Sequence, residues 1–300
     1  MTIFWKNKEG KFAPPNATFQ LIPFSEKTRS VFSQVVHELP EPQTLHLKSR
    51  TDLPNRSDWN LAVQKALSSS LDKVVLARET TLVFHEDVDP FRLTAALQPK
   101  TRGAALFCAR TGPKAFVGLS PERLFLRNGH TVITEAVAGT KPLGIAHTEK
   151  DAREHAFVQQ YLQHTLSPLC ASLQFSPTRV HATATVQHLF SEGTGLLHKP
   201  DDEQLLQALH PTPAVCGTPK IQAQAYLAQN EPFARGWYAG VIGWSTGTAS
   251  EWAVGIRSCV VERNVVRLYA GAGIVQGSDP DSEWDELEAK ISLYGDVCGL

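Results

Sequence analysis

The chain has 300 residues, of which 42% are hydrophobic and 20% are charged, a balance typical of a globular protein with a large core. Its 29 basic and 30 acidic residues nearly cancel and form no basic stripe, so we expect no nucleic-acid partner. The sequence also lacks a run of about 18 apolar residues and the apolar stretch of a signal peptide, which predicts a cytoplasmic protein without membrane contact.

Residues 1–55 are rich in proline and weakly patterned, so we expect short edge strands and loops there. The segment 57–69 has apolar residues at helical spacing behind Ser57, which predicts a helix. A strand-rich stretch follows, in which Asn128 and Gly129 between two strand-like runs predict a hairpin. The strands expected in this stretch are 73–84, 103–110, 114–120 and 122–139.

Helices dominate after this stretch. Thr148 and Asp151 have the spacing of a capping box at the start of the first helix, and Asp279 with Pro280 begins the last one. The expected helices are 148–169, 201–211, 219–229 and the C-terminal one, and strands return at 236–245 and 250–275. Runs of strands followed by runs of helices favour an α+β fold over alternating βαβ units.

Three patterns suggest sites that their context does not support. Residues 271–276 nearly match the dinucleotide-binding fingerprint, but Gln276 replaces its third glycine and no βαβ unit can follow. Residues 243–247 match the nucleophile-elbow pattern, but the last histidine, His210, precedes them, so we expect a hairpin turn. The five cysteines are far apart, which predicts buried free thiols rather than a zinc site or disulfides.

Two of the expected helices carry pairs of acidic residues one turn apart. Glu283, Glu286 and Lys290 lie along one face of the C-terminal helix. Asp151 and Glu154 form a second pair on the helix at 148–169. One such pair is most simply a solvated face, whereas two pairs on separate helices suit a hard cation with oxygen ligands. Magnesium fits this pattern better than a redox metal.

Lys73 and Glu122 occupy positions where burial would change their chemistry. Lys73 begins an apolar strand run and is either a solvated strand end or a lysine whose lowered pKa makes it a base. Glu122 lies between two strand-like runs, where a partly desolvated carboxyl keeps its proton and can act as an acid. Neither residue identifies a function by itself.

Together these segments resemble the chorismate-utilising enzymes, which include isochorismate synthase, salicylate synthase and component I of anthranilate and aminodeoxychorismate synthases. The resemblance runs from about residue 57 to 295 through the ordered blocks KVVLAR, GLSPERL, TEAVAGT, KDAREHAFV, HPTPAVCG, EPFARGWYAG, EWAVGIRS and GAGIVQGSDPDSEWDELEAK. It implies one large α+β unit with centrally stacked, mostly antiparallel sheets and outer helices. Residues 56–300 would form the chorismate-binding catalytic domain, with 1–55 as a short strand and loop segment integrated into it.

The resemblance also implies a role for each candidate residue. Lys73 is expected to be the general base that activates water, and Glu122 the general acid that protonates the leaving ring hydroxyl. The implied Mg²⁺ ligands are Glu154 and Glu286, with Asp151 and Glu283 beside them. The implied contacts to the ring carboxylate are Gly139, Thr140 and Lys290; those to the enolpyruvyl carboxylate are Tyr238, Arg257 and Gly271, and His188 is expected near the ring.

Within the family, the sequence is most like isochorismate synthase. Ala138 stands where the aminodeoxychorismate enzymes carry a lysine nucleophile, and Lys73 as base points to water rather than ammonia. We therefore expect chorismate as substrate, no redox cofactor, no glutamine amidotransferase partner and a monomer. Salicylate synthase, which adds pyruvate elimination, and a catalytically silent chorismate-binding protein are the alternatives. The N-terminal segment is shorter than is usual in the family, which is expected to leave a sheet edge thin, to lower stability or to accompany a loss of activity.

Overall fold

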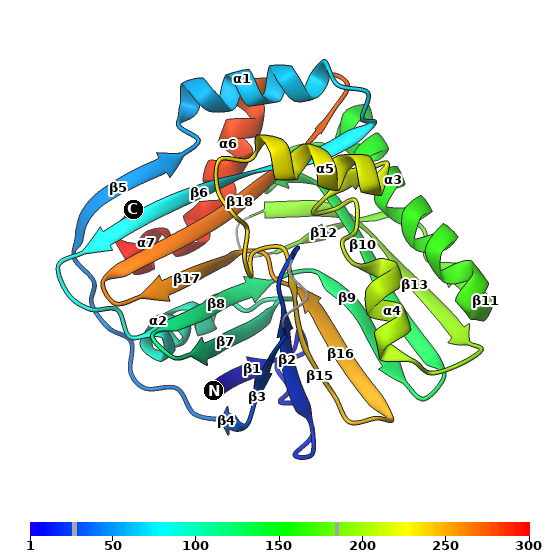
Figure 1. Cartoon of the computed structure of the whole chain (residues 1–300), viewed down its shortest axis with the longest axis horizontal. Helices are drawn as coiled ribbons and strands as arrows, with labels where there is room; N and C mark the ends of the chain where they lie inside the picture. Colours follow the sequence, from blue (N-terminus) through cyan, green and yellow to red (C-terminus); the bar gives the residue numbers. More distant parts are fainter. Residues whose placement is uncertain (26–28, 184–185) are drawn as a thin grey trace.

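The computed structural model describes residues 1–25, 29–183 and 186–300. They form two stacked nine-stranded sheets with helices on the outer sides (Figure 1). The strand pairs are antiparallel, except that β1 and β4 run parallel. This arrangement confirms the predicted α+β fold with central, mostly antiparallel sheets. The division at residue 55 stays a prediction.

The first sheet carries the two long strands that will form one wall of the site. Its strands in spatial order are β14 (Gly217–Thr218), β6 (Lys73–Phe84), β18 (Val265–Val275), β17 (Ser258–Glu262), β8 (Lys114–Ser120), β7 (Ala105–Thr111), β1 (Thr2–Lys6) and β4 (Gln34–Val36), and β5 (Leu47–Leu53) also pairs with β6.

The second sheet supplies the facing wall. Its strands in spatial order are β11 (Cys170–Phe175), β13 (Val186–Leu197), β10 (Thr131–Pro142), β9 (Arg123–Asn128), β16 (Ala249–Val254), β15 (Val241–Ser245), β2 (Thr18–Ile22) and β3 (Ser30–Phe32), and β12 (Arg179–Ala182) also pairs with β13. The β9–β10 hairpin at Asn128 and the β15–β16 hairpin both confirm the sequence predictions.

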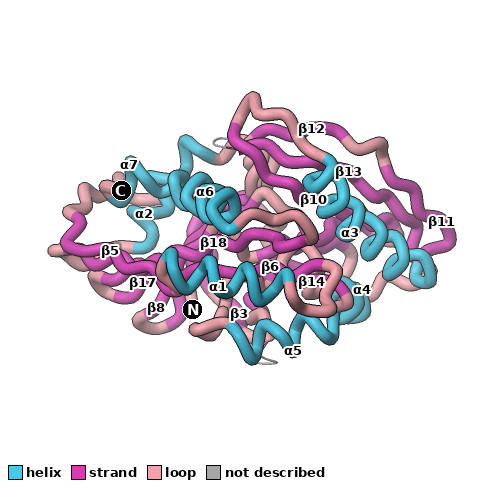
Figure 2. Tube along the Cα trace, turned by 90° about the horizontal axis from the view of Figure 1, so that it is seen from above, coloured by secondary structure: helices cyan, strands magenta, loops and turns pink. Residues whose placement is uncertain are grey.

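The helices cover the two sheets from outside (Figure 2). They are α1 (Arg56–Leu67), α2 (Pro90–Leu97), α3 (Glu149–Leu166), α4 (Asp202–Leu209), α5 (Lys220–Asn230), α6 (Pro280–Ile291) and α7 (Gly295–Cys298), with the 3₁₀ turns η1 (Gln98–Lys100), η2 (Ser167–Leu169) and η3 (Ser292–Tyr294). Among the described residues, no helix combines the length and apolarity needed to cross a bilayer.

Helix caps explain where the helices begin. The predicted capping box of α3 is present, because Thr148 and Asp151 hydrogen-bond each other's backbone N–H groups. Asp279 caps α6 by accepting the N–H of Ser282 at 2.9 Å. The predicted Ser cap of α1 is wrong: Asn55, an equally good capping residue, accepts the N–H of Asp58 at 3.1 Å and starts the helix earlier.

Three apolar layers hold these elements together. One lies between the first sheet and α1, α2 and α6, where the rings of Trp59 and Trp284 meet edge to face. A second lies between the second sheet and α3 and α4, and the third, which includes Trp5 and Phe107, separates the sheets. The five cysteines are buried free thiols, as predicted.

The first 55 residues contribute to both sheets. Strand β1 lies between β7 and β4, and β2 lies between β15 and β3. The prediction of edge strands is therefore wrong for β1 and β2, since β4 and β3 cover their outer edges.

Candidate active site

A pocket lies between the sheets, where β6 and β18 face β10 and β13. The sequence-predicted residues that line it are Glu122, Thr140, Glu154, His188, Tyr238, Arg257, Gly271 and Lys290. Lys73 reaches this group through Glu154, and Glu286 reaches it through Lys290. The structure thus brings the main expected base, acid and substrate-binding residues to one place.

Strand periodicity places one wall of the pocket. In the antiparallel register, Val275 lies opposite Lys73 and Gly273 lies opposite Val75, so alternate residues of β6 and β18 face the second sheet. Gly273 leaves room for a carboxylate, because a Cβ there would lie 2.1 Å from Oε1 of Glu154. These strand glycines bring other side chains close to the sheet.

Lys73 is completely buried, with its Nζ 3.1 Å from Oε1 of Glu154. Burial alone would raise the pKa of Glu154, but the attraction of Lys73, followed by Lys150 and Lys290, outweighs it and lowers that pKa. Glu154 is therefore ionised and holds Nζ of Lys73 at one end of the pocket. This position rules out the solvated strand-end interpretation of Lys73.

Glu122 lies in the link between β8 and β9, and only 3% of it is exposed. Its N–H donates to Oγ of Ser120 at 3.2 Å, which fixes the link. Burial raises the pKa of Glu122 to about 8, with a further contribution from the negative charge of Glu135 and opposing ones from lysines that include Lys73. The carboxyl therefore carries a proton at neutral pH, as an acid catalyst requires.

The second sheet contributes Gly139, Thr140 and His188. Gly139 has a positive φ of 65° at an irregularity in β10, and a Cβ there would meet the backbone oxygen of Asp151 at 3.0 Å. Thr140 Oγ1 lies 3.1 Å from Nδ1 of His188. Burial, reinforced by cations such as Arg257, lowers the pKa of His188 well below its usual value, so the imidazole is neutral.

Arg257 and Tyr238 form the opposite side of the pocket. Arg257 has a left-handed backbone with φ of 49°, which is held in place because its carbonyl accepts the hydroxyl of Tyr294 at 2.9 Å. Burial lowers the pKa of Arg257 to about 10, yet the guanidinium stays charged at neutral pH. The ring of Tyr238 stacks on Tyr269 with centroids 5.1 Å apart.

Lys290 extends this cationic side from α6. Its Nζ donates to Oε1 of Glu286 and to the carbonyl of Gly271, each at 2.6 Å. A Cβ on Gly271 would lie 2.7 Å from the hydroxyl of Tyr238, so glycine is needed for that approach. Arg257 and Lys290 together make a side of the pocket suited to carboxylates.

Three of the carboxylates expected to bind metal surround the ammonium of Lys150. Burial alone would lower the pKa of Lys150, but their attraction raises it. The three carboxylates are Glu154, Glu283 and Glu286, and Glu283 forms an ion pair with Lys150. Burial and then repulsion from Glu286 raise the pKa of Glu283 to about 7. Oxygen donors around one positive charge fit a hard cation such as Mg²⁺.

The metal site is not preassembled. Within the described ranges, no three histidine, cysteine or carboxylate side chains form a ready-made cation cluster. Asp151 uses Oδ2 to accept the N–H of Thr148 at 2.7 Å, and its Oδ1 lies 3.4 Å from Nζ of Lys141. The structure thus places Asp151 in the helix cap, and the other three carboxylates against lysines.

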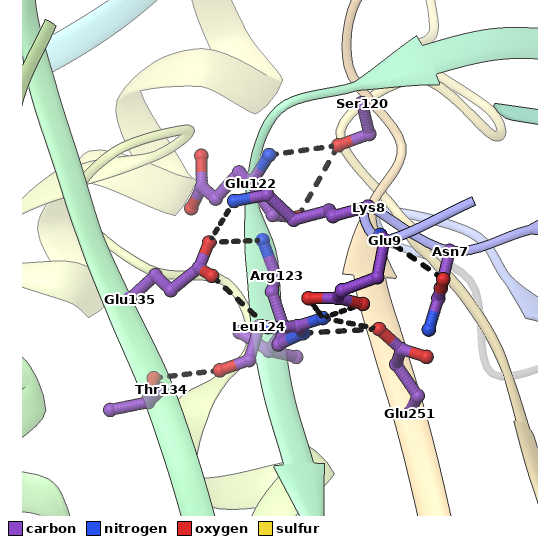
Figure 3. A network of polar contacts seen from close by, with 10 residues as sticks. All are labelled: Asn7, Lys8, Glu9, Ser120, Glu122, Arg123, Leu124, Thr134, Glu135 and Glu251. Atoms are coloured by element: carbon purple, nitrogen blue, oxygen red, sulfur yellow. Dashed lines mark hydrogen bonds and ion pairs between the residues drawn. The ribbon is translucent and has the colours of Figure 1, made fainter. Parts of the chain in front are cut away.

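Sequence reasoning missed three residues close to the site. Tyr269 was detectable, because it alternates with Gly271 along β18 and so shares the pocket face. Glu135 and Lys8, which lie beside Glu122 in a buried network (Figure 3), had no signal of their own. Lys8 in particular belongs to a segment without clear patterning.

Comparisons with known proteins point to one family. A family model described as "Chorismate binding enzyme" matches residues 15–295. Isochorismate synthase 2, chloroplastic, from Arabidopsis thaliana is 39% identical over 98% of this chain and 55% of its own length. Isochorismate synthase MenF from Escherichia coli (strain K12) is 36% identical over 96% of this chain and 72% of its own length. This chain therefore spans about half the length of the plant relative.

A solved structure shows the same fold. It is that of MenF, the menaquinone-specific isochorismate synthase from Escherichia coli, with a TM-score of 0.89 and 28% sequence identity. The match covers 98% of this chain and 88% of that one.

Proposed function

This chain belongs to the chorismate-binding enzyme family, and from that premise we propose that it is a Mg²⁺-dependent isochorismate synthase. The reaction replaces the C4 hydroxyl of chorismate by a new hydroxyl at C2. The observation that carries the proposal is a buried, protonated carboxyl, Glu122, in a pocket with a cationic side, together with the buried Lys73, whose ion-pair partner Glu154 lines the same pocket. The relatives reported above, which bear the name isochorismate synthase, support it.

The two residues have complementary tasks. Lys73 reacts as the neutral amine: its Nζ takes a proton from a water molecule, whose oxygen forms a bond with C2 of the ring. The ring double bonds shift, the bond between C4 and its hydroxyl breaks, and Glu122 gives its proton so that the hydroxyl leaves as water. Glu122 can do so at neutral pH because its pKa is raised to about 8. Since one hydroxyl replaces another, the reaction is reversible.

The remaining polar residues bind and orient the substrate. Arg257 and Lys290, which both line the pocket, would each hold a carboxylate of chorismate, with Tyr238 and the neutral His188 beside the ring. Glu154, Glu283 and Glu286 would hold Mg²⁺, which supplies positive charge for a substrate carboxylate. Asp151 supports this group by capping α3.

Product analysis after incubation with chorismate and Mg²⁺ tests the proposal. Isochorismate is the expected product, and Lys73→Ala or Glu122→Gln should abolish its formation while circular dichroism shows an intact fold. Near-normal rates in either variant would refute the assigned roles. Salicylate with pyruvate would replace the proposal by salicylate synthase, and unchanged chorismate would reject an enzymatic role.

The nucleophile also determines which partner is needed. Because water is the proposed nucleophile, we propose that no glutamine amidotransferase subunit takes part; an aminated product formed from ammonia would contradict this. A monomeric state and a cytoplasmic location follow from the sequence-based expectations. Light scattering of the purified chain checks the first of these.

A further inference from the structure

The turn after β1 reaches the link that carries Glu122. Nζ of Lys8 lies 2.6 Å from Oε2 of Glu135 on β10, with side chains only 10% and 3% exposed. The same Oε2 accepts the backbone N–H of Arg123 at 3.2 Å, directly after Glu122 in the chain. One buried carboxylate therefore joins the N-terminal turn to the backbone of the acid (Figure 3).

The turn itself is fixed on both sides. Oδ1 of Asn7 accepts the N–H groups of Glu9 at 3.1 Å and Lys11 at 2.8 Å. The carboxylate of Glu9 then receives Nη2 of Arg123 at 2.8 and 2.9 Å. Lys8 is thus presented by a well-defined turn, and its ammonium has little freedom to leave Glu135.

We propose that Lys8 and Glu135 are positioning residues for Glu122: their buried pair holds the β8–β9 link in place and determines how readily the acid gives up its proton. This inference rests on the proposed function, in which Glu122 is the acid. Neither residue is among the side chains that line the pocket. They act through charge and through the backbone of Arg123.

Opposite charges of the pair act on Glu122 in opposite directions. After burial, Glu135 is the next cause that raises its pKa, whereas Lys8 lowers it. The other titratable groups around Glu122 are Lys73 on β6, Lys290 on α6, Tyr238, and the pocket residues Glu154, His188 and Arg257. When Lys8 is lost, Glu135 keeps a positively charged partner, because Nη1 of Arg123 donates to its Oε1 at 3.3 Å.

The decisive measurement is the titration of Glu122 itself, followed by carboxyl ¹³C NMR in the full chain and assigned with Glu122→Gln. Lys8→Met should raise the pKa of Glu122 by about one unit, and Glu135→Gln should lower it by a similar amount. The limb of the pH–rate profile that Glu122 governs should move in the same directions. Lys8→Arg should restore the wild-type titration.

A merely structural pair would not produce shifts of opposite sign. Lys220→Met is the matched control, because Lys220 is also partly buried and donates to the carbonyl of His210 at 2.8 Å, away from Glu122. It should lower stability without moving the Glu122 titration. If Lys8→Met fails to fold, the isosteric Glu135→Gln decides: a downward shift supports the inference and an unchanged titration overturns it.

The two proposals fail separately. Wild-type turnover of chorismate together with unshifted titrations in both variants would refute the positioning role alone. Shifts of opposite sign in the two variants, together with a wild-type protein that leaves chorismate unchanged, would refute the proposed function alone.

Discussion

Gly273→Ala should remove most activity while leaving the protein folded. The new Cβ would lie 2.1 Å from Oε1 of Glu154, a distance that real side chains do not tolerate, and at a tight 3.0 Å from Cε of Lys73. The carboxylate tip is the group that can move, since it ends a flexible side chain. It would turn away from β18 and leave Lys73 without its ion-pair partner.

The size of the effect follows from that displacement. Oε1 of Glu154 has to retreat by about 1 Å, a misplacement that typically costs ~100-fold in rate. Overpacking of this kind destabilises a protein by about 1–3 kcal/mol, less than the total stability of an ordinary domain. We therefore expect kcat of Gly273→Ala to fall ~100-fold with a modest decrease in the unfolding free energy.

Isochorismate formation and urea unfolding, measured on the same preparations, check this prediction. Gly295→Ala is the neutral control, because nothing lies within 4 Å of a Cβ at Gly295. Gly243→Ala is the opposite control: its Cβ would lie 2.2 Å from the backbone oxygen of Glu251, which cannot move aside, so stability should fall most there. Wild-type kcat in Gly273→Ala would show that the position of Glu154 does not matter for turnover.

Two further predictions concern stability. Burial, with a smaller contribution from Lys220, lowers the pKa of His210 to about 3, so the unfolded chain binds the extra proton and stability falls as pH drops below about 6.5. His210→Leu should therefore lose ~2 kcal/mol less than wild type between pH 7 and 5 in urea unfolding; equal losses would contradict this. Asp202→Asn should cost about 3 kcal/mol at pH 7, because Asp202 holds the buried Arg127 through Nε at 2.5 Å and Nη2 at 3.0 Å; an unchanged unfolding midpoint would contradict that.

The sequence predicted those parts of the fold that depend on neighbouring residues. The α3 capping box at Thr148 and the turn at Asn128 and Gly129 are local chemistry, and both were correct. Helix α2 was missed although Asp89 and Pro90 form the same kind of start as Asp279 and Pro280 do in α6. Strand β2 could not be placed, since its partner β15 lies more than 200 residues away.

The roles of the candidate site residues depend even more than the fold on contacts between residues far apart in the sequence. The residues alone left Lys73 open between a solvated strand end and a base, and only the family resemblance selected the base. Its burial is produced by Glu154 on α3 and by the missing side chain of Gly273 on β18, neither of which is near it in sequence. Burial of a polar group depends on which elements cover it, and a local pattern does not contain that information.

The position of Lys8 follows from strand register once the sheet is known. Lys6 lies opposite Leu106 on β7, and Leu106 lies opposite Leu119 on β8. Two successive antiparallel pairings make β1 and β8 run in the same direction, so both strands leave the sheet at the same end. Lys8 lies just beyond Lys6, where β1 ends, and Glu122 lies just beyond the end of β8. The turn that carries Lys8 and the link that carries the acid are therefore close together. A slip of β1 by one residue would reverse the faces of its side chains, exchange Phe4 and Trp5 between the two apolar layers that they occupy, and break the Lys8–Glu135 pair. The register of β1 is therefore under two constraints at once, one from the apolar core and one from the catalytic acid.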